Sequence, residues 1–224
     1  MVAGEARFQT QKDRVRKRLL KYTRKAFRRL PQLDKPRILD AGCGSGVPTM
    51  ELARLTNGEI IGLDINHGLL ALLTKKIEKA GLSARVKVMN CSIVAMEFPD
   101  ESIDIIWAEG SIAVIGFKRG LKEWRQFLKP NRFLAVHDEI GNITEKLKQI
   151  SSCGYDLLGY FILGEETWWN EYFAPLEKRI NEIRIKHAND PKALAVLDEE
   201  QREIDMFKKN PGRYCSVFFI MKKR

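Results

Sequence analysis

Short apolar runs alternate with amphipathic stretches between residues 36 and 140, and this alternation constrains the fold of the 224-residue chain most strongly. The apolar runs predict buried strands over residues 37–40, 59–65, 86–89, 103–108 and 133–137. The amphipathic stretches predict helices over residues 49–55, 68–80 and 119–128. Consecutive parallel strands need crossover helices, and these cover both faces of the sheet. The sequence therefore predicts a doubly wound α/β domain with a mostly parallel sheet.

The alternation stops after residue 141. Residues 144–152 predict a further helix, and residues 154–163 and 214–221 predict two late strands. Charged, helix-forming residues fill the stretch 165–209 between these strands. We expect the two late strands to pair antiparallel at one edge of the sheet, with 165–209 as a helical insertion between them.

The net charge of the chain, +10, resides in its N-terminal segment. Residues 1–37 hold 13 basic and 3 acidic side chains, while the remaining 187 residues hold 26 of each sign. An apolar stripe at helical spacing predicts a helix over about residues 12–30 that packs on the rest of the chain. The stripe comprises Val15, Leu19, Tyr22, Ala26 and Leu30. We assign residues 1–35 to a basic N-terminal lid helix and residues 36–224 to the main domain.

The basic helix has two interpretations. Its charged faces are either solvated, as most charge runs are, or attract an anionic partner such as RNA, a phosphorylated metabolite or a membrane surface. No stretch of the sequence approaches the ~20 apolar residues of a membrane-spanning helix, and the N-terminus is too charged for a signal peptide. We therefore expect a cytoplasmic protein without a membrane span.

Four cysteines lack the spacing of a metal site. Cys43, Cys91, Cys153 and Cys215 form no CxxC pair, which argues against a structural zinc site and a disulfide scaffold. No other constellation of metal ligands is visible, so we expect no bound metal.

A glycine-rich loop follows the first predicted strand, in the run ILDAGCGSG from Ile38 to Gly46. Glycines permit positive φ angles and let the backbone approach a ligand closely. A dinucleotide-binding loop would place its third glycine at Val47, and the P-loop pattern is absent, so neither kind of site is expected. Asp64 closes the second strand, where a carboxylate can accept hydrogen bonds from both hydroxyls of a ribose.

Together with Asp64, the loop from Asp40 to Gly46 and the run DIIWAEG from Asp104 to Gly110 resemble class I S-adenosylmethionine-dependent methyltransferases. The resemblance covers about residues 36–140. The longer run from Trp107 to Trp124 is similar to a bacterial and archaeal group of small methyltransferases related to the ubiquinone/menaquinone-biosynthesis type. The resemblance implies a Rossmann-like, seven-stranded sheet with an antiparallel last strand, helical lid elements, and S-adenosyl-L-methionine as cofactor.

The resemblance also implies which residues bind the cofactor. The glycines would wrap its methionine part, Asp40 would hold its ammonium group, and Asp64 would bind the ribose. Many relatives carry an acidic residue at the position of Ser92, where serine accepts a hydrogen bond without charge assistance. The implied set is Asp40, Gly42, Cys43, Gly44, Gly46, Asp64, Ile65, Asn66, Ser92, Ile93 and Ala108.

Two residues are candidates for the chemistry. The resemblance places Glu109 beside the transferable methyl group, and His137 follows the fifth strand, at the sheet edge where α/β proteins bind ligands. His137 is either a general base or a hydrogen-bonded core residue. An aromatic group in the insertion, comprising Trp168, Trp169, Tyr172 and Phe173, either anchors the insertion to the sheet or lines an apolar acceptor pocket.

These features favour a methyltransferase that acts on a small-molecule acceptor by in-line displacement. One alternative is an RNA or protein methyltransferase that docks through the basic helix, although no Asn-Pro-Pro-Tyr motif or RNA-binding module is present. Another is a cofactor-binding protein without catalysis. The identity of the acceptor, its nucleophilic atom and the oligomeric state stay open.

Overall fold

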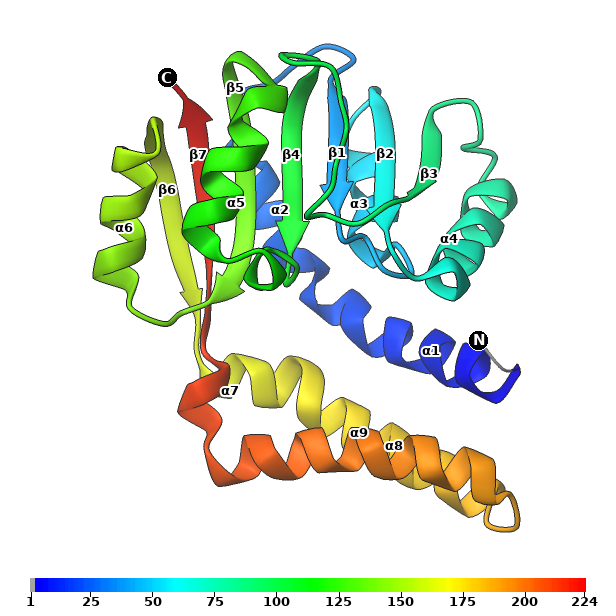
Figure 1. Ribbon diagram of the computed structural model, residues 1–224. Coiled ribbons are helices and arrows are strands. Elements are labelled where there is room, and N and C mark those ends of the chain that lie inside the picture. The colour runs from blue at the N-terminus through cyan, green and yellow to red at the C-terminus, as the bar shows by residue number, and fades with distance from the viewer. Residues whose placement is uncertain (1–2) are drawn as a thin grey trace. The chain divides into compact units, whose positions relative to one another are not determined.

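The computed structural model describes residues 3–224, with side chains from Phe8 onward (Figure 1). Contacts within the chain divide it into two compact units. The sheet unit comprises residues 21–162 and 216–224, and the helical unit comprises residues up to Leu20 together with 163–215. The chain thus leaves the sheet unit after residue 162 and returns to it at Ser216.

The sheet has seven strands in the order β3-β2-β1-β4-β5-β7-β6. Strands β1 to β5 pair in parallel, while β7 runs antiparallel to β5. This arrangement confirms the predicted Rossmann-like α/β fold with an antiparallel last strand. The strands are β1 (Arg37–Ala41), β2 (Glu59–Asp64), β3 (Val86–Asn90), β4 (Ile103–Glu109), β5 (Leu128–Glu139), β6 (Tyr155–Leu163) and β7 (Ser216–Lys223).

Helices cover both faces of this sheet. Figure 1 shows α5 (Phe117–Trp124) and α6 (Ile143–Ser152) in front of it, with α2 (Leu20–Phe27) and α3 (Val47–Leu55) behind. Alternate residues of a strand point to opposite faces, so each central strand must be apolar on both sides. Accordingly, no side chain between Ile103 and Ala108 is more than slightly exposed.

The two late strands are neighbours, as predicted, but only β6 lies at the edge. Strand β7 lies between β5 and β6, and Figure 1 shows β6 and β7 running in opposite directions. Its composition explains this place, because the residues from Val217 to Met221 are apolar and fully buried on both faces. Strand β6, by contrast, leaves Leu158, Tyr160 and Ile162 exposed.

The basic N-terminal segment is longer than predicted and is not one continuous helix. It forms α1 (Ala3–Arg16), a 3-10 turn (Lys17–Leu19) and α2. The predicted apolar stripe divides between the units. Val15 and Leu19 pack in the core of the helical unit, whereas Ala26 and Leu30 are buried residues of the sheet unit.

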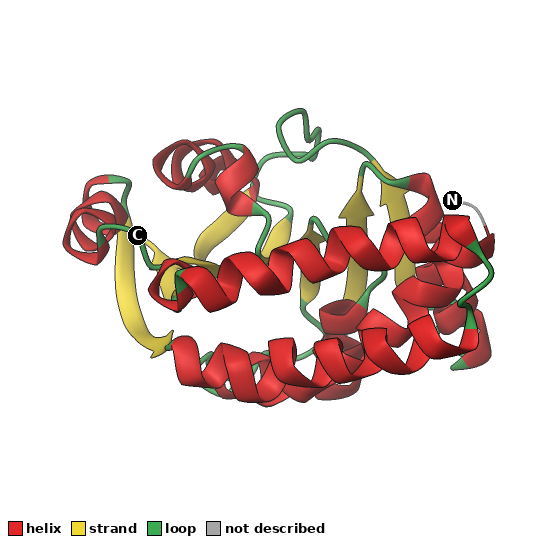
Figure 2. Ribbon diagram, turned by 90° about the horizontal axis from the view of Figure 1, so that it is seen from below, coloured by secondary structure: helices red, strands yellow, loops and turns green. Residues whose placement is uncertain are grey.

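The remaining helices complete the two units. In the sheet unit, α4 (His67–Lys79) follows β2, and short 3-10 turns span Ile112–Val114 and Arg125–Phe127. In the helical unit, α7 (Glu165–Trp168) continues through a π-helical turn (Trp169–Phe173) into α8 (Ala174–Lys186), followed by α9 (Pro191–Lys209) and a 3-10 turn (Pro211–Tyr214). Figure 2 shows α8 and α9 lying side by side.

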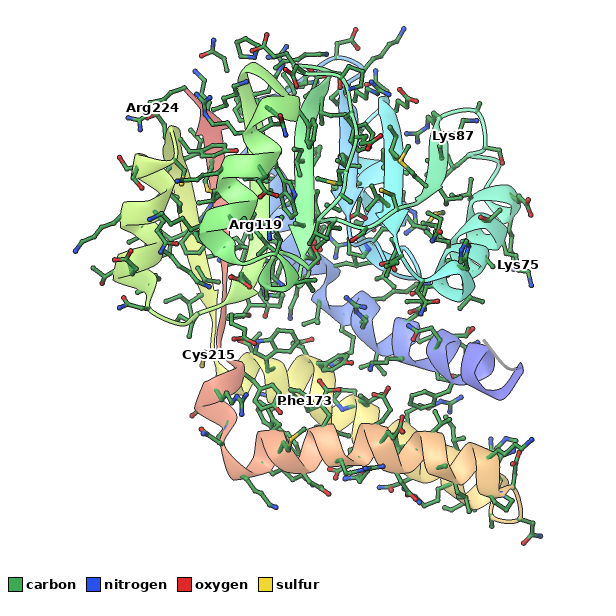
Figure 3. The ribbon with its side chains drawn as sticks, viewed as in Figure 1. Lys75, Lys87, Arg119, Phe173, Cys215 and Arg224 are labelled. Carbon is green, nitrogen blue, oxygen red and sulfur yellow. The ribbon has the colours of Figure 1, made fainter. Side chains whose placement is uncertain are left out.

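Aromatic side chains form the core of the helical unit. Phe173, labelled in Figure 3, stacks on Phe207 with ring centroids 4.3 Å apart and meets Tyr214 edge-on at 5.4 Å. Phe8 and Val15 of α1 belong to the same cluster. The predicted aromatic group of the insertion therefore belongs to the core that joins α1, α8 and α9. This place in the core differs from both interpretations of the sequence, an anchor to the sheet and an acceptor pocket.

No helix in the described part of the chain is both long enough and apolar enough to cross a membrane.

Replacing Phe173 by alanine tests this core. Phe173 is 2% exposed, so Phe173→Ala removes a buried ring and is expected to cost about 3–5 kcal/mol of unfolding free energy. Ile185→Ala on α8 is the control, because Ile185 is 81% exposed and should change stability by less than about 0.5 kcal/mol. Urea denaturation followed by tryptophan fluorescence measures both. Equal effects of the two substitutions would contradict this account of the core.

Candidate functional site

The carboxyl ends of β1, β2, β4 and β5 meet at one edge of the sheet. Asp40 of β1 is in register with Gly62 of β2 and Trp107 of β4, and Glu109 of β4 is in register with His137 of β5. The turns that follow these strands therefore begin side by side. In open α/β sheets this edge is where ligands bind.

The glycine loop after β1 has three residues in the left-handed region, with φ of 76° at Gly42, 55° at Gly44 and 80° at Gly46. A Cβ atom on Gly42 would lie 2.4 Å from Cβ of Ser111, and one on Gly46 would lie 2.2 Å from Cδ1 of Leu73. Packing therefore requires glycine at both positions. At Gly44 the nearest atom would be 4.0 Å away, so the backbone there is uncrowded on the side to which a Cβ atom would point.

Asp64 links the loop after β1 to the end of β2. Its Oδ2 atom accepts a hydrogen bond from the backbone N–H of Gly44 at 2.8 Å, and its Oδ1 atom accepts one from Asn66 at 2.8 Å. Asn66 in turn caps α4, since its Oδ1 atom accepts hydrogen bonds from the N–H groups of Gly68 and Leu69. The predicted residues Gly44, Asp64 and Asn66 are thus joined in one network.

Asp40 lies in β1 just before the loop, and Cys43 lies in the loop. The Asp40 carboxylate is buried and accepts a hydrogen bond from the Thr49 hydroxyl at 2.6 Å. Burial, helped by the negative charges of Asp40 and Asp64, raises the pKa of the Cys43 thiol far above its usual value. Cys43 therefore stays protonated and packs as a small residue in the turn.

The residues predicted to surround an adenine differ in exposure. Ile65, directly after Asp64, is 70% exposed, which is unusual for an isoleucine that follows a buried strand. The Cys91 N–H donates to the Asp64 carbonyl at 3.2 Å and brings the turn containing Ser92 beside the end of β2. Ile93 and Ala108 are buried, and only their backbone or a shift of neighbouring side chains offers a ligand contact.

Glu109 and His137 lie opposite each other at the ends of the adjacent strands β4 and β5. A single Glu109 oxygen, Oε1, accepts hydrogen bonds from Trp107 Nε1 and from Thr23 Oγ1, both at 2.8 Å. His137 Nε2 lies 2.7 Å from the Ser216 hydroxyl, and its ring stacks on Phe218 with centroids 4.4 Å apart. The orientations of both side chains are therefore fixed by neighbouring residues.

Several residues that support the site were not selected from the sequence. Ser111 donates to the Ala41 carbonyl beneath Gly42, and Lys76 donates to the Ser45 carbonyl at 2.6 Å. Arg24 of α2 pairs at 2.7 Å with Glu51 of α3. Ser111 directly follows the run DIIWAEG, so its place next to this motif was a signal in the sequence. The contact of Thr23 with Glu109 joins segments 86 residues apart, which no local pattern predicts.

Among the residues whose side chains are described, no three His, Cys, Asp or Glu side chains come together as a metal site.

Part of the chain matches known proteins in sequence. Residues 38–131 match the family described as "Methyltransferase domain". A sterol 24-C-methyltransferase of Gibberella zeae is 32% identical over 103 residues, which is 46% of this chain and 27% of that enzyme. The chain thus matches only about a quarter of the length of this relative.

Solved structures share the fold over most of the chain. The cyclase SpnF superposes with a TM-score of 0.75 at 19% identity, covering 91% of this chain and 80% of that one. A methyltransferase from Geobacter sulfurreducens, solved with S-adenosyl-L-homocysteine, gives a TM-score of 0.72 at 17% identity, covering 92% and 90%. The matched segment contains the glycine loop, Asp64 and Glu109, so this part of the chain is similar to a methyltransferase domain, and the sheet has the order seen in the fold.

Proposed function

We propose that the protein transfers the methyl group of S-adenosyl-L-methionine to a small-molecule acceptor by in-line displacement. The observation that carries the proposal is the link between Asp64 and Gly44, because it sets a carboxylate beside an uncrowded stretch of glycine backbone at the ligand-binding edge. A structural relative supports the choice of cofactor, since the Geobacter sulfurreducens methyltransferase was solved with S-adenosyl-L-homocysteine, the product that S-adenosyl-L-methionine leaves after methyl transfer.

The residues at this edge suit the parts of the cofactor. Asp64 has a carboxylate for the ribose hydroxyls, and exposed Ile65 offers an apolar surface to the adenine. Gly44 leaves room for the methionine part, near the negative charge of Asp40. When bound, the cofactor supplies an electrophilic methyl group on a sulfonium. The protein then has to align the acceptor with that methyl group and exclude water.

We assign Glu109 to the acceptor side of the site. Thr23 and Trp107 hold one of its oxygens in place, so the carboxylate has little freedom to turn away. His137 serves as a general base only if the acceptor must lose a proton, as a hydroxyl does. Its contacts with Ser216 and Phe218 suit either that role or a structural one.

The proposed class of acceptor depends on the relatives and on the contacts that the basic residues make within the protein. The Gibberella zeae enzyme is a sterol methyltransferase, and this supports a small molecule over a polymer. In the sheet unit, Arg24 pairs with Glu51, while Lys25 and Arg29 lie over the ring of Phe161. These cations are partly used within the protein, which favours a small acceptor over RNA docking. The likeness to the ubiquinone/menaquinone-biosynthesis type stays a prediction within this class.

A second candidate is a reaction other than methyl transfer on the same cofactor-binding fold. The likeness to SpnF favours it, because that protein is a cyclase. The two candidates differ in whether S-adenosyl-L-homocysteine forms during turnover.

We expect S-adenosyl-L-homocysteine to bind and to raise the melting temperature, since a ligand that binds only the folded chain stabilises it. Asp64→Asn should weaken this binding by about 1.5–3 kcal/mol, roughly 10- to 150-fold, through loss of charge-assisted hydrogen bonds. Asp100→Asn, in an exposed turn, is the control. Isothermal titration measures all three proteins. Binding of nicotinamide dinucleotide in place of this ligand would overturn the proposal.

The loop glycines allow a sharper test of ligand approach. Gly44→Ala should lower cofactor affinity at least tenfold while costing only about 1–2 kcal/mol of stability, because its Cβ would come no closer than 4.0 Å to the Leu69 side chain. Gly46→Ala should cost more stability, since its Cβ overlaps Leu73. Parallel titration and denaturation of both variants separate the two effects. A Gly44 variant with normal affinity would show that the cofactor does not lie against this backbone.

We also propose that residues 1–35 act as a lid segment and that residues 165–209 contribute to acceptor binding. Leu19→Asp places a charge against the core of the helical unit and should lower turnover of an acceptor by tenfold or more, with cofactor affinity unchanged. Lys17→Asp, exposed in the same 3-10 turn, is the matched control. The assay measures the S-adenosyl-L-homocysteine that forms when each protein is incubated with S-adenosyl-L-methionine and a panel of sterols, phenols and amines. Equal turnover in both variants would remove the N-terminal segment from acceptor binding.

A further inference from the structure

A groove in the helical unit is lined mainly by cations. It has a volume of about 430 Å³ and lies between α1, the 3-10 turn after it and α8. Its charged residues are Arg14, Arg18, Lys178, Arg179 and Glu182, that is, four cations and one anion. Val15 and Pro175 supply an apolar wall. The volume matches that of small-molecule sites in general.

Two of these cations pair with none of the acidic residues whose side chains are described. Arg14 is exposed, and its guanidinium makes only a long hydrogen bond of 3.3 Å to Gln11 Oε1. Lys178 is exposed and makes no ion pair with any acidic residue whose side chain is described. Charge of one sign in a concave surface raises the local concentration of ions of the opposite sign.

The other two cations are fixed in place. The Nε and Nη2 atoms of Arg179 donate to Gln11 Oε1 at 3.0 and 2.8 Å, and Nη1 pairs with Glu182 at 2.5 Å. Arg18 lies 3.5 Å from Glu171 and donates to the Asn170 carbonyl at 3.4 Å. The groove therefore combines two arginines that are held in place and paired with carboxylates and two exposed cations, Arg14 and Lys178, which carry its uncompensated charge.

We propose that this groove binds the phosphate or diphosphate group of a small molecule. A phosphate ester carries nearly two negative charges and three acceptor oxygens, which Arg14 and Lys178 can share. The apolar wall of Val15 and Pro175 would contact the organic part of the ligand. The site lies wholly in the helical unit, so the proposal goes beyond methyl transfer and does not depend on it.

A nucleic acid fits this unit less well. Within α9, the stretch from Asp198 to Asp205 holds five acidic side chains and one basic one, Arg202. Asp198 and Glu200 are paired with Arg184 and Lys12, and the remaining acidic side chains of this stretch repel an extended polyanion. A single phosphate group in the groove avoids them, which favours a small ligand.

The test compares two double variants of the full chain. Arg14→Gln with Lys178→Gln removes the two unpaired cations of the groove. Lys192→Gln with Lys209→Gln removes the same charge from exposed positions on α9 outside it. We expect saturable binding of inorganic pyrophosphate to the unmodified protein by isothermal titration, at least tenfold weaker in the groove variant and within twofold of unmodified in the control.

Further arms of the experiment identify the source of the phosphate. Inorganic phosphate should bind more weakly than pyrophosphate, and vesicles of phosphatidylcholine with phosphatidic acid should not retain the protein. If the vesicles retain the protein, if pyrophosphate displaces it from them, and if the groove variant is not retained, the phosphate site is supported and its ligand is a lipid head group. No saturable pyrophosphate binding, or an equal loss in both double variants, would overturn the proposal. Melting temperatures of both variants show that each remains folded.

Discussion

The Asp64 carboxylate is the interaction on which the ligand-binding edge depends. Strands β1 and β2 end beside each other, and the Asp64 side chain accepts hydrogen bonds from the turns that follow both. The glycine loop has three left-handed residues and would be costly to order without such an anchor. Asn66 extends the network to the first turn of α4, so the loop, the strand end and a helix are fixed together.

A second layer of contacts supports this edge from the face covered by α2 and α3. Thr23 fixes Glu109, Arg24 pairs with Glu51, and Thr49 satisfies the buried carboxylate of Asp40. Arg24 and Thr49 give partners to the buried carboxylates of Glu51 and Asp40, and Thr23 adds a second donor to Glu109. The N-terminal segment therefore has a structural use in the sheet unit, where the sequence shows only its charge.

The sequence was sufficient for the fold because the alternation of apolar runs and amphipathic helices is local and strong. The positions of the loop glycines and of Asp64 at the ends of β1 and β2 followed from the glycine motif and the predicted strands, whereas their roles toward a cofactor stay predictions. The break between α1 and α2 did not, because the apolar stripe continues through it and only the division between two cores reveals it. The place of β7 between β5 and β6 also could not be predicted, because the sequence of an apolar strand does not indicate which strands lie beside it.

The position of β7 also bears on how the chain can assemble. Strand β6 is made before the helical unit, yet its neighbour in the sheet, β7, follows that unit in the sequence. During synthesis the exposed apolar residues of β6 therefore have no adjacent strand until residues 164–215 have been added and the chain has returned. An unpaired strand of this kind is prone to association with other chains. Helices α7 to α9 follow one another in the sequence and contact one another, so their packing can begin as soon as these residues have been added.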